Sequence, residues 1–148
     1  MVIDYDPLKK FLRRSAGIDI DKSDMKRLND LIGSKLNDLL VIGVRNASCN
    51  NRDVVMEPDL PLTKGFLERR QEFRQWDEEV GLKPILEQLA TYPPLERALS
   101  ADVEAMLPDL AGTLAMLAGR TMKILDPAVR NPDGILWERM LTLMELLL

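Results

Sequence analysis

Two long helical patterns, one in each half of the chain, place the strongest limit on the fold. Residues 28–33 read Leu-Asn-Asp-Leu-Ile-Gly and residues 107–112 read Leu-Pro-Asp-Leu-Ala-Gly, at an offset of 79 positions. Each copy lies in a run, over about residues 23–49 and 100–125, whose apolar residues recur every three or four positions, which is the period of an α-helix. A repeat placed in two matching helices indicates that the chain contains two copies of one structural unit.

The first long pattern is apolar on more than one flank. A helix of about 27 residues is roughly 40 Å long, which is enough to form the axis of a small domain. Because two apolar flanks need cover on both sides, we expect the two long helices to cross within one shared core. The first flank consists of Met25, Leu28, Ile32, Leu36, Leu39 and Gly43, and the second of Leu31, Leu40, Ile42 and Val44.

Shorter helices are predicted on both sides of each long one. Asp6 and Pro7 suit a first helical turn, and Gly17 suits the end of that helix. Pro108 lies inside the second long pattern, where it predicts either a kink or the true start of that helix. The expected short helices cover about residues 6–16, 57–74, 82–89 and 135–148, with a brief β-type stretch at 52–56.

Composition excludes several classes of function. The chain of 148 residues is 46% apolar and 30% charged, which favours a globular protein over a disordered one. It contains no His, so every His-based triad and His-liganded metal site is excluded. Its single cysteine, Cys49, permits no internal disulfide and fits a reducing cytoplasm. No apolar run reaches the length of about 18 residues that a membrane span needs, so no membrane role is expected.

One loop carries a resemblance to a known family. Residues 51–60, Asn-Arg-Asp-Val-Val-Met-Glu-Pro-Asp-Leu, resemble the loop that precedes the third helix of archaeal histones. In that family an Arg in the loop pairs with an Asp that opens the last helix, so the resemblance implies an ion pair between Arg52 and Asp59. The chain as a whole resembles a bacterial family of tandem histone-fold proteins of unknown function. That resemblance implies an all-α fold of two short-long-short units, 1–75 and a degenerate 76–148, paired as an intramolecular pseudo-dimer with one joint core.

Basic residues suggest where DNA could bind. The first helix is expected to present one basic face, and histone folds hold phosphates with their first-helix ends and paired loops. Phosphate contacts need only cations at spaced positions. The alternative is an ordinary solvated face, and the net charge of −4 together with acidic neighbours at Asp19, Asp21 and Asp53 makes DNA binding weak. The candidate residues are Lys9, Lys10, Arg13 and Arg14, to which the resemblance adds Lys22 and Arg52.

The final helix is apolar on too many sides for an ordinary surface helix. Its side chains either fill the core of the pseudo-dimer or form an outer face through which copies associate, because exposed apolar patches often mark interfaces. The candidate residues for self-association are Trp137, Met140, Leu141, Met144 and Leu148.

No catalytic, cofactor or metal site is expected. The acidic run at residues 19–30 lacks the Gly at the sixth position and the Glu at the twelfth that a calcium loop needs. No Gly-rich phosphate loop is present, and Cys49 has no His to activate it. The sequence therefore predicts a non-catalytic module that assembles with itself or another protein. The alternative is a sequence-independent architectural DNA-binding protein, which would be associated with the nucleoid.

Overall fold

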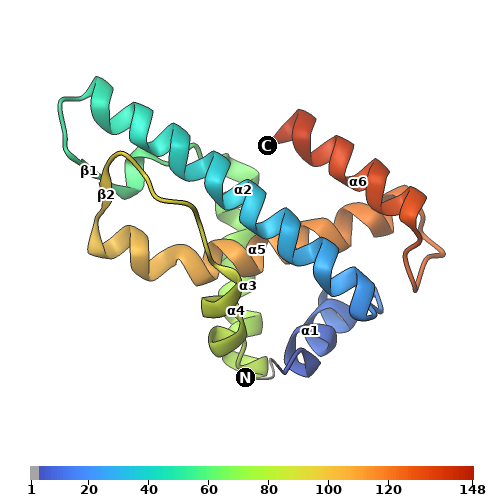
Figure 1. Cartoon of the computed structure of the whole chain (residues 1–148). Helices are drawn as coiled ribbons and strands as arrows, with labels where there is room; N and C mark the ends of the chain where they lie inside the picture. The colour runs from blue at the N-terminus through green and yellow to red at the C-terminus, as the bar shows by residue number, and fades with distance from the viewer. Residues whose placement is uncertain (1–3) are drawn as a thin grey trace.

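The computed structural model describes residues 4–148, and these residues are mostly helical (Figure 1). They form six α-helices, one short 3-10 helix and two strands of two residues each. In chain order the elements are α1 (Asp6–Ala16), α2 (Lys22–Cys49), β1 (Val54–Val55), η1 (Glu57–Asp59), α3 (Lys64–Val80), α4 (Lys83–Leu89), β2 (Ala98–Leu99), α5 (Ala101–Leu125) and α6 (Gly134–Leu147).

Local side chains set the ends of the helices. The carboxylate of Asp21 accepts a hydrogen bond from the backbone N–H of Asp24, and the carboxylate of Asp24 accepts one in return, so the two form a capping box at the start of α2. Ser100 caps α5 in the same way through the N–H of Val103. Gly17 ends α1 with a left-handed φ of 69°, which glycine adopts without strain.

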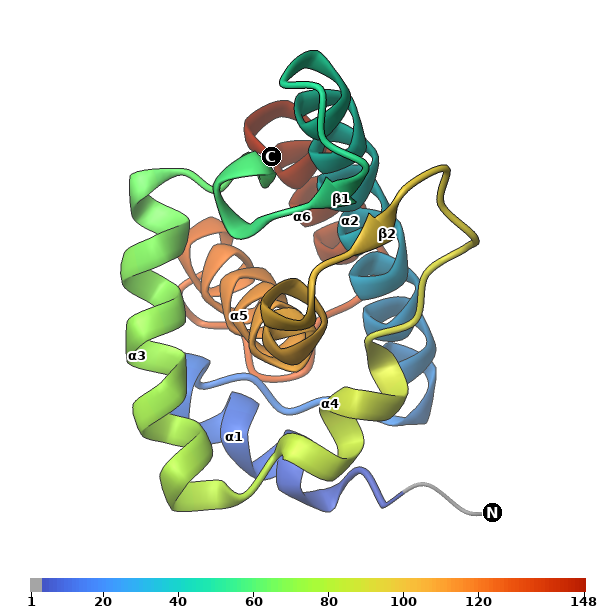
Figure 2. The ribbon, with the colours of Figure 1, turned by 90° about the vertical axis from the view of Figure 1, so that its left-hand side faces the viewer.

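Helix α5 forms the centre of the molecule. It packs against α1, α2, α3, α4 and α6, and Figure 2 shows the first four of these around it. Its middle turns are buried on every side, and the hydroxyl of the buried Thr113 donates to the carbonyl of Asp109 at 2.7 Å. At Gly112 the ring of Phe73 lies where a Cβ atom would be. The absence of a side chain there therefore allows α3 to approach α5 closely.

The loops before one long helix meet the loops after the other. At one end β1 pairs in parallel with β2, with Val54 opposite Ala98 and Val55 opposite Leu99. At the other end the N–H of Asp19, just before α2, donates to the carbonyl of Arg130, just after α5, at 2.7 Å. The two long helices are therefore connected at both ends, and the core between them is continuous.

One expectation about an individual element needs correction. The helix expected from residue 57 is instead the short η1, and α3 begins only at Lys64. Leu60 is extended because Pro61 follows it, which stops the first turn, and Thr63 then caps a new helix. Pro108 lies inside α5, which begins at Ala101, so it does not mark the start of that helix.

The sequence repeat matches the positions of the two long helices. α2 begins at Lys22 and α5 at Ala101, so their starts are separated by the same 79 positions as the repeat. The boundary expected at residues 75–76 falls inside α3, which runs unbroken from Lys64 to Val80. Among residues 4–148, no helix combines the length and the apolar character that crossing a membrane requires.

Candidate interaction face between α2 and α6

One side of α6 is part of the core. Trp137, Met140 and Met144 are buried within the chain, so for these three candidates the core alternative holds and the outer association face does not. The indole N–H of Trp137 donates to a carboxylate oxygen of Asp24 at 2.7 Å, and this contact joins α6 to the start of α2. Burial is the main cause of the raised pKa of Asp24. The hydrogen bonds that its carboxylate accepts from the backbone N–H of Asp21 and from Trp137 oppose this increase.

The other side of α6 and its last turn are exposed. Leu141 and Leu148, both candidates for self-association, are accessible to solvent. Leu146 and Leu147, which precede Leu148, retain 75% and 72% of their accessible surface. The apolar end of this helix therefore points away from the core.

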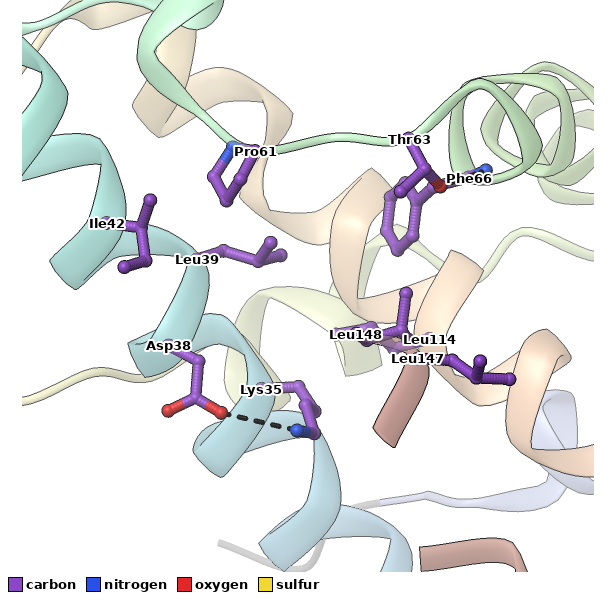
Figure 3. Close-up of a pocket in the computed structure, with 10 residues that line it drawn as sticks. All are labelled: Lys35, Asp38, Leu39, Ile42, Pro61, Thr63, Phe66, Leu114, Leu147 and Leu148. Atoms are coloured by element: carbon purple, nitrogen blue, oxygen red, sulfur yellow. Dashed lines mark hydrogen bonds and ion pairs between the residues drawn. The ribbon is translucent and has the colours of Figure 1, made fainter. Parts of the chain in front are cut away.

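A pocket of about 220 Å³ lies between α2, the start of α3 and the end of α6 (Figure 3). Leu39 and Ile42 of α2 line one side, and Leu147 and Leu148 of α6 line another. The remaining residues are Lys35, Asp38, Pro61, Thr63, Phe66 and Leu114, so the lining is mostly apolar. Since Val41 lies next to Ile42, we define the α2–α6 face as Val41, Ile42, Leu147 and Leu148 around this pocket.

Lys35 is a buried charged residue in the lining of the pocket. It is only 5% exposed, and its ammonium binds Glu145 of α6 at 2.6 Å and Asp38 of α2 at 3.3 Å (Figure 3 shows the second contact). A buried ammonium needs such partners because desolvation without them is costly. Lys35 is not among the residues expected from the sequence, although its place between Leu31 and Leu39 at steps of four puts it on an apolar side of α2.

The arginines proposed to bind DNA are paired with carboxylates of this chain. Arg13 contacts Asp19 at 2.6 Å. Arg14 contacts Glu79 at 3.0 Å and lies over the ring of Trp76. These pairs neutralise much of the positive charge that the first helix was expected to present.

Arg52 and Asp59 form the ion pair that the histone resemblance implies. The two terminal nitrogens of Arg52, Nη1 and Nη2, donate to the buried carboxylate of Asp59, which also accepts a hydrogen bond from the N–H of Met56 at 2.8 Å. The guanidinium lowers the pKa of Asp59, and the carboxylate in turn raises the pKa of Arg52. The pair fixes the β1 loop against η1, which is a structural role.

The three candidate lysines are differently placed. Lys9, Lys10 and Lys22 form no ion pair with any of residues 4–148. Lys9 and Lys10 lie on α1, whereas Arg52 lies beside β1 at the opposite end of the molecule (Figures 1 and 2). The structure therefore does not gather the six candidate cations into one patch.

Within the described part of the chain, no cluster of three or more His, Cys, Asp or Glu residues could hold a metal ion. Cys49, the single cysteine, is exposed at the end of α2.

Comparisons with known proteins give a family without an assigned activity. A family model described as "Domain of unknown function (DUF1931)" matches residues 8–145. A crystal structure of a protein from Thermus thermophilus has 44% sequence identity, covers 100% of both chains and superposes with a TM-score of 0.88. The crystal structure of protein AQ328 from Aquifex aeolicus has 22% identity, covers 97% of this chain and 95% of that one, and has a TM-score of 0.84. An uncharacterized protein from Aquifex aeolicus (strain VF5) is 24% identical over 119 residues, which are 80% of this chain and 70% of that protein.

Proposed function

Since the chain belongs to the family described as a domain of unknown function, DUF1931, we propose a function from its geometry. We propose that the protein is a non-catalytic assembly module whose two halves are paired histone-fold units. The proposed partner is a second copy of the chain, and the observation that carries the proposal is the exposed apolar α2–α6 face.

The arrangement of loops supports the histone-fold pair. In each half a short helix precedes a long one, and a further helix follows it: α1, α2 and α3 in the first half and α4, α5 and α6 in the second. The loop after each long helix contacts the loop before the other, through β1 and β2 at one end and through Asp19 and Arg130 at the other. A two-fold relation between equivalent halves produces reciprocal loop contacts of this kind. The repeat at an offset of 79 residues fits the same relation.

The α2–α6 face supports assembly. Val41 and Ile42 retain 49% and 37% of their accessible surface, and they adjoin Leu147 and Leu148 around a hollow. The same face of a second copy can cover this face, because a two-fold contact joins one surface patch to itself. Clustered exposed apolar residues of this kind mark interaction sites in soluble proteins.

Sedimentation velocity over a wide range of concentration tests this proposal. A chain of 16.8 kDa should reach about twice that mass as concentration increases. The double variant Leu147→Ser, Leu148→Ser should remain monomeric, because it removes apolar area from the face. The control is Ile124→Ser, which changes an exposed apolar residue of α5 outside the pocket. A wild-type chain that stays monomeric at every concentration would overturn the proposal.

Sequence-independent DNA binding is the second candidate. Its support is that Lys9, Lys10 and Lys22 form no ion pair with residues 4–148 and so keep their charges available for phosphates. Fluorescence anisotropy with a labelled duplex of about 30 base pairs should show weak binding that decreases steeply between about 25 and 200 mM salt. The double variant Lys9→Glu, Lys10→Glu should abolish it, whereas unchanged binding would exclude α1 as the contact.

A further inference from the structure

The outer face of the C-terminal half of α2 is uncovered along four helical turns. Six positions from Ser34 to Cys49 follow one another at steps of four, three, one, three and four residues. In a helix with 3.6 residues per turn, these steps keep all six on one side over about 22 Å. All six side chains are exposed. We define the α2 stripe as Ser34, Asp38, Val41, Ile42, Arg45 and Cys49.

The residues on the two sides of the α2 stripe contact other segments of the chain. On one side Lys35 holds α6 through Glu145. On the other side the hydroxyl of Ser48 accepts a hydrogen bond from Arg97, in the segment before β2, at 3.0 Å. Figure 1 shows this half of α2 along the edge of the molecule, with no other helix on its outer side. The stripe between these contacts faces solvent.

The residue types of the α2 stripe are arranged symmetrically about the point between Val41 and Ile42, except that the two charges have opposite signs. Val41 and Ile42 form an apolar centre, with Asp38 three residues before it and Arg45 three residues after it. In an antiparallel second copy, Asp38 of each chain lies opposite Arg45 of the other, and Val41 lies opposite Ile42. A parallel copy would place like charges together, which is unfavourable. The sequence of the stripe therefore selects one orientation.

Both charged groups are available for a partner. Arg45 is exposed and forms no ion pair with any of residues 4–148. Asp38 is half-exposed, and its contact with Lys35 is the longer of the two contacts that Lys35 makes. A carboxylate has two oxygens and several acceptor positions, so Asp38 can bind Lys35 and a guanidinium together.

We infer that two copies of this chain pair through their α2 stripes about a two-fold axis between Val41 and Ile42, with reciprocal Asp38–Arg45 ion pairs. This inference rests on the proposed assembly function and specifies its orientation and register. A two-fold contact forms each pair twice, so two ion pairs flank an apolar centre of four β-branched side chains. One helix crossing is a small interface, for which a dissociation constant on the order of 10 μM is expected.

Charge reversal tests the register. Arg45→Asp should weaken the dimer by at least about tenfold, because each Asp38 then faces another carboxylate. Asp38→Arg should weaken it in the same way, whereas the double variant Asp38→Arg, Arg45→Asp should return to within about threefold of the wild type. Lys26→Asp is the matched control, since it makes the same change of charge at an exposed position of α2 outside the stripe. Sedimentation velocity measures each dimer, and circular dichroism checks that each variant is folded.

The outcomes separate this inference from the proposed function. A wild-type chain that never dimerises overturns both. A dimer that is lost in Leu147→Ser, Leu148→Ser but not in Arg45→Asp overturns the α2 stripe and leaves the assembly proposal intact. A dimer that Arg45→Asp weakens and the double reversal does not restore overturns the antiparallel register.

Discussion

At the scale of single residues, two glycines at equivalent positions of the repeat have different surroundings. Gly33 in α2 has open space where a Cβ atom would lie, whereas the ring of Phe73 fills that space at Gly112 in α5. Neither glycine has a positive φ. The backbone therefore tolerates other residues at both sites, and packing alone separates them.

Alanine at these two positions should act in opposite directions. Gly112→Ala forces Phe73 out of its place, which should lower the free energy of unfolding by about 1–3 kcal/mol or more. Gly33→Ala removes a flexible residue from a helix and should raise it by up to about 1 kcal/mol. Urea denaturation followed by circular dichroism measures both. Equal effects at the two sites would contradict the close packing of α3 on α5.

The sequence could predict some residues of the candidate site and not others. Leu141 and Leu148 follow from the apolar character of the last helix. The choice between the core and an outer face for Trp137 does not, because its partner Asp24 lies 113 positions away and no local pattern connects them. Periodicity puts Lys35 on an apolar side of α2, but its charged partner Glu145 belongs to α6 and is 110 positions away. Contacts between distant segments decide these roles, and the periodicity of a single helix does not identify the partner.

At the scale of elements, the crossing of α2 and α5 stabilises the molecule through apolar side chains at equivalent depth. Leu36 of α2 and Leu110 of α5 are both 0% exposed. The periodicity of the sequence was sufficient to predict both helices, since α2 and α5 each begin within one residue of the expected start. It could not place the start of α3, where Pro58 fits a first helical turn and the following Leu60-Pro61 stops that turn.

Truncation of a buried leucine side chain in each of the two long helices tests this burial directly. Leu36→Ala and Leu110→Ala should each lower the free energy of unfolding by about 2–5 kcal/mol, because each leaves a cavity in the core. Val41→Ala, on the exposed α2 stripe, should change it by less than about 0.5 kcal/mol. Chemical denaturation of the monomer at low concentration provides the comparison. A small loss at Leu36 would mean that this face of α2 is not in the core.

At the scale of the whole molecule, acidic groups make stability depend on pH. The pKa of Asp59 is lowered chiefly by its hydrogen bonds with Arg52, and the pKa of Glu72 is lowered chiefly by Arg120. A carboxyl group whose pKa is lower in the folded chain than in the unfolded chain stabilises the fold above its ordinary pKa. That contribution is lost as the pH falls through the folded value. Asp24, whose pKa is raised, has the opposite effect.

Asp59→Asn isolates one of these contributions. At pH 7 the variant should be less stable than the wild type, because Arg52 loses its charged partner. As the pH is lowered below about 4, the wild type should lose this advantage and the difference between the two should shrink. Denaturant titrations of both proteins at pH 7 and pH 3 measure the difference. A difference that does not change with pH would show that the ion pair contributes nothing.

The exchange of loops at the two ends of the molecule has a consequence for how the chain is made. During synthesis α1, α2 and α3 leave the ribosome before α5 and α6, so β1 emerges before the β2 with which it pairs, and Asp19 emerges before Arg130. Because α5 forms the centre of the core, the face of α2 that packs on α5 stays uncovered until α5 has emerged, at about residue 125. We therefore expect the nascent chain to remain sensitive to proteases until α5 has emerged.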